Sequence, residues 1–125
     1  MNNIDFTHKK DYLLVSIEDK TITFPRAKEI LTRIGVECDL LGCQKVLLDE
    51  RSVKKREVTP PKIMKLSKEV EEVGLREVHL AFLCQPHLID KDSDRLRLFT
   101  YQHEYIIQHF SKEEEAIGWL KSAHK

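Results

Sequence analysis

The sequence lacks any long hydrophobic run and any excess of charge of one sign. No apolar stretch approaches the roughly 18–20 residues that a helix needs to cross a bilayer, so no membrane span is predicted. The first residues contain no basic segment followed by an apolar one, so no secretory signal is predicted either. Lysine plus arginine and aspartate plus glutamate both number 21, which gives a formal net charge of +0. A neutral chain lacks the positive field that drives non-specific binding to nucleic acid, so we expect no nucleic-acid partner.

Cysteine and glycine are both scarce. The three cysteines are an odd number in a chain without a secretory signal, which favours reduced thiols in the cytoplasm over a disulfide framework. Cys38 and Cys43 have the spacing of a metal-binding pair but no second pair accompanies them, so no zinc site is expected. The four glycines form no phosphate-binding loop. We therefore predict a cytoplasmic protein that holds no metal or other cofactor.

The chain is organised around residues 45–50. Three consecutive apolar residues, 46–48, leave neither face of this segment for water. An apolar run closed by charges is typical of a strand buried on both faces of a mainly parallel sheet. Helical patterns before and after it predict helices on the front and back of that sheet. Residues 78–84 are also apolar, apart from His79, so this second strand should lie beside the first. We interpret His79 as a hydrogen-bonded core or edge histidine.

The whole pattern predicts one α/β domain over residues 1–125, with a mixed sheet and the order β-β-α-β-α-β-α-β-α. At 125 residues the chain can bury about two-thirds of its unfolded surface without staples. The first helix should be capped by Thr23, carry Pro25 in its first turn and end at Gly42. Residues 51–58 are interpreted as a long charged connection. The expected strands cover residues 4–9, 12–17, 45–50, 78–84 and 105–110, and the expected helices cover 23–42, 59–74, 90–103 and 111–120.

The carboxyl edge of the predicted sheet is the expected functional site. Open α/β sheets usually place their sites where parallel strands end. The helix that begins at Thr59 should direct its free N–H groups to the same crevice, which suits an anionic or polar group. Arg51 and Thr59 are the expected main contacts; a solvated strand end with weak ion pairs is the alternative interpretation. The candidate binding residues are Asp49, Arg51, Ser52, Thr59, Cys84 and His87.

Cys84 and His87 allow a catalytic interpretation. A thiol activated by an imidazole is a real nucleophile arrangement. However, cysteine is among the most buried residue types and no third orienting group is evident, so an inert thiol is favoured. We therefore predict no catalytic residues and no enzymatic activity.

Two segments resemble the SpoIIAA-like proteins, which belong to the wider group of STAS and CRAL-TRIO relatives. Phe110-Ser111, Glu114-Glu115-Ala116 and Trp119-Leu120 look like the family's closing F-x-x-x-E-E-A-x-x-W-L pattern, and residues 46–49 look like its central strand ending in Asp. The resemblance spans nearly the whole chain. It implies a STAS-like α/β fold that binds partner proteins, in some members under control of a phosphorylated Ser or Thr.

The family's phosphorylation motif is of the type Asp-Ser-[Ser/Thr]-Gly, at the start of the helix after the central strand. The corresponding region here has no Ser-Gly pair. By position Thr59 is the nearest match, and Ser52 is the only serine in the loop. We therefore expect this chain to be a poor substrate for a kinase of the STAS-switching type.

Two functions of different classes stay open from the sequence. The first is a non-catalytic protein-interaction or regulatory module, which an exposed surface with an apolar centre would favour. The second is a small carrier that holds an apolar or amphipathic, lipid-like ligand between helices and sheet, which an apolar cavity would favour. An enzyme that uses Cys84 and His87 ranks last. The expected partner is a protein or a small ligand, and a homodimer is a further option.

Overall fold

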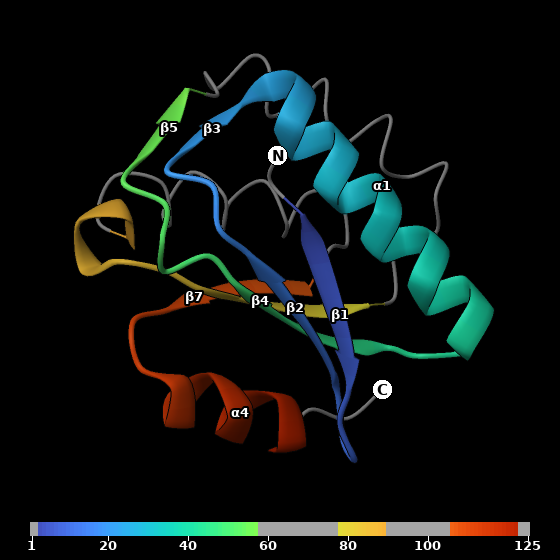
Figure 1. Ribbon diagram of the computed structural model, residues 1–125. Coiled ribbons are helices and arrows are strands. Elements are labelled where there is room, and N and C mark those ends of the chain that lie inside the picture. The colour runs from blue at the N-terminus through green and yellow to red at the C-terminus, as the bar shows by residue number, and fades with distance from the viewer. Residues whose placement is uncertain (1–2, 58–77, 90–105, 123–125) are drawn as a thin grey trace.

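The computed structural model describes residues 3–57, 78–89 and 106–122 (Figure 1). Its central feature is a mixed five-stranded sheet with the order β1-β2-β4-β6-β7. Strand β1 pairs antiparallel with β2, and the other three pairings are parallel. The strands predicted over residues 4–9 and 12–17 form a hairpin, in which the Lys9 N–H donates to the Tyr12 carbonyl at 2.9 Å. The strands are β1 (Ile4–His8), β2 (Leu13–Ile17), β4 (Lys45–Asp49), β6 (His79–Leu83) and β7 (Ile106–Phe110).

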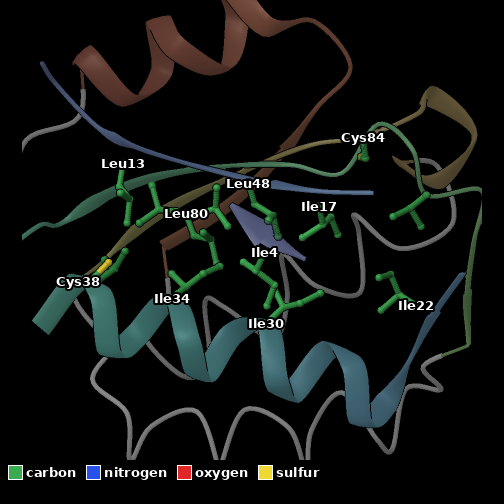
Figure 2. Close-up of a cluster of buried hydrophobic side chains, with 14 of the residues drawn as sticks. Ile4, Leu13, Ile17, Ile22, Ile30, Ile34, Cys38, Leu48, Leu80 and Cys84 are labelled. Atoms are coloured by element: carbon green, nitrogen blue, oxygen red, sulfur yellow. The ribbon is translucent and has the colours of Figure 1, made fainter. Parts of the chain in front are cut away.

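Of the described helices, α1 (Phe24–Leu41) covers one face of this sheet and α4 (Glu113–Ser122) covers the other (Figure 1). Helix α1 places Ile30, Ile34 and Cys38 against the strands, as Figure 2 shows. Helix α4 covers the opposite face with Ala116 and Leu120. The predicted sheet between helices is therefore confirmed. The helices predicted over residues 59–74 and 90–103 lie outside the described residues, and residues 86–89, for which we predicted neither a helix nor a strand, are helical.

The ends of α1 follow the local sequence signals. The Thr23 hydroxyl accepts from the Arg26 N–H at 3.4 Å, and Pro25 occupies the first turn, where its missing N–H has no partner to lose. Gly42 adopts φ +66°, a left-handed conformation that favours glycine, and ends the helix. Both predicted boundaries are confirmed. Helix α4 begins at Glu113, later than a cap at Ser111 predicts.

The central strands divide their side chains between the two faces. In β4, Val46 and Leu48 face the α1 cluster, whereas Leu47 is 1% exposed and packs beneath α4. Strand β6 lies beside β4 in parallel register, which confirms the predicted neighbour. We also expected Phe82 to be buried like Leu47; it is only partly buried, and the Arg56 guanidinium lies over its ring at 5.9 Å.

A second, two-stranded sheet was not predicted. Strand β3 (Thr21–Thr23) pairs in parallel with β5 (Lys55–Glu57), inside the segment that we interpreted as a connection. The sequence of β5 is Lys-Arg-Glu, so it shows none of the apolar alternation that indicates a strand. Contacts of the preceding residues hold β5 in place. The Lys54 N–H donates to the Lys20 carbonyl at 2.7 Å, and Val53, next to Lys54, is fully buried.

His79 is buried at the start of β6, but only part of its predicted hydrogen bonding is present. Its backbone N–H donates to the Gln44 carbonyl at 2.8 Å, and its ring meets Trp119 edge-on at 5.9 Å. Its Nδ1 atom has no hydrogen-bond partner among the described residues. Burial and the nearby Lys45 cation lower the pKa of His79, and the Gln44 backbone offsets part of that effect.

This lowered pKa predicts a loss of stability in acid. In the unfolded chain His79 is protonated near its ordinary pKa of about 6.5, whereas in the folded chain it is protonated only at a lower pH. The free energy of unfolding should therefore decrease as the pH falls through that value and level off below the folded pKa. Urea titrations of the wild type and His79→Phe between about pH 7 and pH 5 test this, with the variant showing the flatter profile. Two profiles of equal slope would contradict it.

Candidate functional site

The candidate residues gather where β4 and β6 end, as predicted. Asp49 is the last residue of β4, Arg51 and Ser52 follow it, and Cys84 and His87 follow β6. Thr59 lies outside the described residues. The two segments are joined directly, because the Gln85 side chain donates to the Arg51 carbonyl at 2.8 Å. The carboxyl edge of the sheet is therefore one continuous surface.

Arg51 makes several hydrogen bonds at this edge. Its Nε and Nη2 atoms donate to the two carboxylate oxygens of Asp49 at 3.0 and 2.8 Å, and its backbone N–H donates to Asp49 at 3.2 Å. Glu113, the first residue of α4, lies 3.4 Å from the same Nη2. These hydrogen bonds, led by Asp49, raise the pKa of Arg51. Exposed pairs add little stability, but a bidentate pair fixes the direction of the guanidinium. The Arg51 side chain is 52% exposed, so it is positioned and still accessible.

Ser52 directs its hydroxyl to backbone carbonyls of the fold. Its hydroxyl lies 2.8 Å from the Asp19 carbonyl and 3.2 Å from the Ile17 carbonyl, and it donates toward both. These bonds tie the loop after β4 to the end of β2. A phosphate on this oxygen would remove the donor and place negative charge against two carbonyl oxygens.

Cys84 and His87 do not form the arrangement that a thiol nucleophile needs. Cys84 is 1% exposed and belongs to the α1 cluster (Figure 2). The Nε2 atom of His87 is 2.9 Å from the Lys54 carbonyl, so its ring is engaged with the loop before β5. Burial and then the nearby Cys43 raise the pKa of the other buried thiol, Cys38, to about 12, which favours its protonated form near neutral pH. The described residues contain no cluster of three metal-ligating side chains.

Sequence reasoning missed a buried ion pair beneath this surface. Glu50 is 5% exposed and is paired with Arg56 of β5, whose guanidinium lies over the Phe82 ring at 5.9 Å. Arg56 also lies 3.5 Å from the Nε2 atom of His109 on β7. The one available signal was Glu50 itself, because a carboxylate next to three buried residues needs a cation. Nothing in the spacing identified Arg56 as that cation rather than one of its lysine neighbours.

A second buried carboxylate lies at the end of β2. Asp19 accepts from Nε and Nη2 of Arg26 at 2.9 and 3.1 Å, and Glu29 accepts from Nη1 of the same arginine at 2.8 Å. The hydrogen bonds that Arg26 donates to Asp19 are the main cause that raises the pKa of Arg26. This pair fixes the first turn of α1 to the loop that Ser52 also holds. The edge therefore contains a frame of arginine–carboxylate pairs.

Exposed lysines border this frame on the side of β3 and β5. The backbone N–H groups of Lys54 and Lys55 both point to the Lys20 carbonyl, so these three residues are immediate neighbours. All three are exposed, and Lys55 has Glu57 as a carboxylate partner at 3.4 Å. The surface thus combines the hydrogen-bonded Arg51 guanidinium with exposed lysine cations and with carboxylates. Such a surface suits recognition of a charged or polar partner.

Of the helices that the structure describes, none is both long and apolar enough to span a bilayer. No protein-family model and no curated protein matches the chain in sequence. Solved structures match it in shape. An anti-sigma factor antagonist from Mycobacterium paratuberculosis has a TM-score of 0.63 at 9% identity, over 98% of this chain and 96% of that one.

Two further structures resemble the chain over nearly its whole length. An uncharacterised protein from Shewanella loihica, described as having a SpoIIAA-like fold, has a TM-score of 0.55 at 17% identity, over 95% of this chain and 93% of that one. The anti-sigma factor antagonist SpoIIAA in its unphosphorylated form has a TM-score of 0.52 at 12% identity, over 98% of this chain and 100% of that one. The resemblance predicted from the central strand and the closing helix is confirmed: the chain has a SpoIIAA-like, STAS-type α/β fold.

Proposed function

We propose that this chain is a non-catalytic regulatory module that binds a protein partner at the carboxyl edge of its sheet. The observation that carries the proposal is Arg51, which Asp49 fixes in two hydrogen bonds while half of its side chain stays exposed. Similar structures described as anti-sigma factor antagonists support a regulatory role, and a regulatory protein such as an anti-sigma factor is the partner that this likeness favours.

The chemistry of the edge favours a partner with acidic or mixed polar side chains. Arg51 supplies a planar fork that matches a carboxylate, and Lys20, Lys54 and Lys55 extend the positive charge toward β3 and β5. Asp49 and Glu113 already accept hydrogen bonds from the Arg51 guanidinium. A partner must therefore approach the guanidinium on its solvent-exposed side. The buried Cys84 thiol weighs against an enzyme at this edge. The described side chains between α1 and the sheet pack against one another, which gives no support to a lipid-like ligand there.

The test begins with native mass spectrometry of the chain isolated from its own host, which detects bound protein and bound lipid in one spectrum. The co-purifying protein then serves as the probe in titrations against Arg51→Ala and Arg51→Lys. We expect Arg51→Ala to weaken binding by about tenfold or more, with Arg51→Lys in between because it keeps the charge but loses the fork.

Lys121→Ala is the matched control, because Lys121 is an exposed cation at the far end of α4. It should bind like the wild type. Equal affinities for Arg51→Ala and Lys121→Ala, with both folds intact, would place the site elsewhere. A stoichiometric lipid in place of a protein would instead support the carrier.

A further inference from the structure

Strand β1 is an edge of the five-stranded sheet, and among the residues that the structure describes no strand pairs with its outer side (Figure 1). In an antiparallel pair, alternate residues direct their backbone groups to the partner strand and away from it. The Lys9 N–H donates to Tyr12 across the hairpin, so Lys9, Thr7 and Asp5 direct their backbone groups to β2. The N–H and C=O groups of Phe6 and His8 therefore point away from the sheet, in position to pair with another strand.

The flank of α1 beside this edge carries exposed apolar side chains. Arg33 of α1 lies over the Phe6 ring at 5.4 Å, which shows that this side of the helix faces β1. Residues three and seven positions further on share the same side of a helix, and these are Val36 and Leu40. Val36 is 50% exposed and Leu40 is 74% exposed, although both are large and apolar. A free strand edge and an apolar helix flank thus lie next to each other.

We propose that a second copy of this chain covers both features, pairing its β1 antiparallel with β1 across a two-fold axis at Thr7. This register places the outward backbone groups of Phe6 opposite those of His8 of the other copy, so the hydrogen-bond pattern of the sheet continues. Ile4 and Phe6 pack in the α1 cluster, and the alternating Asp5 and Thr7 are exposed on the other face. The two α1 helices then approach from the same side, and Val36 and Leu40 of both copies lie near the axis.

Charge complementarity selects this register. An axis at Thr7 places Asp5 opposite Lys9 of the other copy twice, once for each half of the interface, and oppositely charged cross-strand pairs are favourable. An axis at Phe6 would place Asp5 opposite Thr7, and an axis at His8 would place Asp5 opposite Asp11. Of these three axes, only the one at Thr7 places the Asp5 carboxylate of each copy opposite the Lys9 ammonium group of the other. The carboxyl edge of the sheet stays free, so this dimer does not depend on the proposed function.

The test is a charge swap read out by sedimentation equilibrium. The purified full chain should give a mass of twice 14.7 kDa at high concentration and dissociate on dilution. Asp5→Lys and Lys9→Asp should each raise the dimer dissociation constant by about tenfold or more, because each variant turns two attractive pairs into repulsive ones. The double variant Asp5→Lys/Lys9→Asp restores opposite charges and should return the constant to near the wild-type value.

Lys112→Asp is the control, since Lys112 is an exposed lysine just before α4 and makes the same charge change away from β1. It should leave the dissociation constant unchanged, and circular dichroism should show all variants folded. A monomer at every concentration would overturn the proposal, as would an edge that pairs only with a strand of another protein. A dimer that neither reversal weakens, or a double variant as weak as the single ones, would overturn it too.

Discussion

Leu47→Ala is expected to lower the free energy of unfolding by about 2–5 kcal/mol, as large-to-small changes in a core do. Leu47 lies in the middle of β4, is 1% exposed and contacts the cluster that includes Ala81, Leu83 and Leu120. Strand β6 is held by its hydrogen bonds to its neighbouring strands, and α4 is held by its packing on the sheet. The cavity left by the missing side-chain atoms therefore cannot close fully. Urea denaturation measures the change.

Leu41→Ala is the matched control for that measurement. Leu41 ends α1 and is 44% exposed, so the same deletion of side-chain atoms should change the free energy of unfolding by about 0.5 kcal/mol or less. Similar losses for the two variants would mean that Leu47 is not a core residue, and the arrangement of β4 between α1 and α4 would be wrong.

Arg56→Ala is expected to destabilise the chain by about 3–5 kcal/mol, because it leaves the Glu50 carboxylate buried without its partner. Glu50 is 5% exposed and the Arg56 side chain is 14% exposed, so water cannot replace the lost cation fully. The variant also lacks the contacts that the Arg56 guanidinium makes with the Phe82 ring and with His109. Chemical denaturation at neutral pH gives the size of the loss.

A double-mutant cycle separates the charge from the packing. Glu50→Gln keeps the size of the side chain and removes its charge, so Glu50→Gln/Arg56→Ala should be less destabilised than the sum of the two single variants. The coupling measures what the pair contributes. Additive losses would show that Arg56 stabilises the edge through Phe82 and His109 and that the pair with Glu50 is incidental.

The elements that the sequence predicted are those whose signals are local. Three apolar residues identified β4, and Thr23 and Gly42 identified the ends of α1, because a strand interior and a helix cap depend on their own neighbours in the chain. Strand β5 was missed because its Lys-Arg-Glu sequence forms a strand only through pairing with β3. Arg56 was missed for the same reason, since only the fold brings it to Glu50.

The position of the candidate residues at the carboxyl edge could be predicted from the sequence, but their individual hydrogen bonds could not. Asp49 and Arg51 were expected together at the edge, because both lie at the carboxyl end of a strand that had to be central. The inward direction of Ser52 could not be read from sequence, since its acceptors belong to the end of β2 and the loop after it. The engagement of His87 with Lys54 likewise depends on β5. Whether Thr59 contributes stays a prediction, because it lies outside the described residues.

The strand order also determines which strand pairs can form first during folding. Only β1 and β2 are joined by a two-residue turn, and a hairpin of this kind closes in about 1–10 μs. The partners in β2·β4, β4·β6 and β6·β7 are each separated by roughly 30 residues of chain, so each requires the closure of a long loop before any contact can form. The single antiparallel pair is thus the fast local step, and the three parallel pairs that build the carboxyl edge carry the slow part of folding.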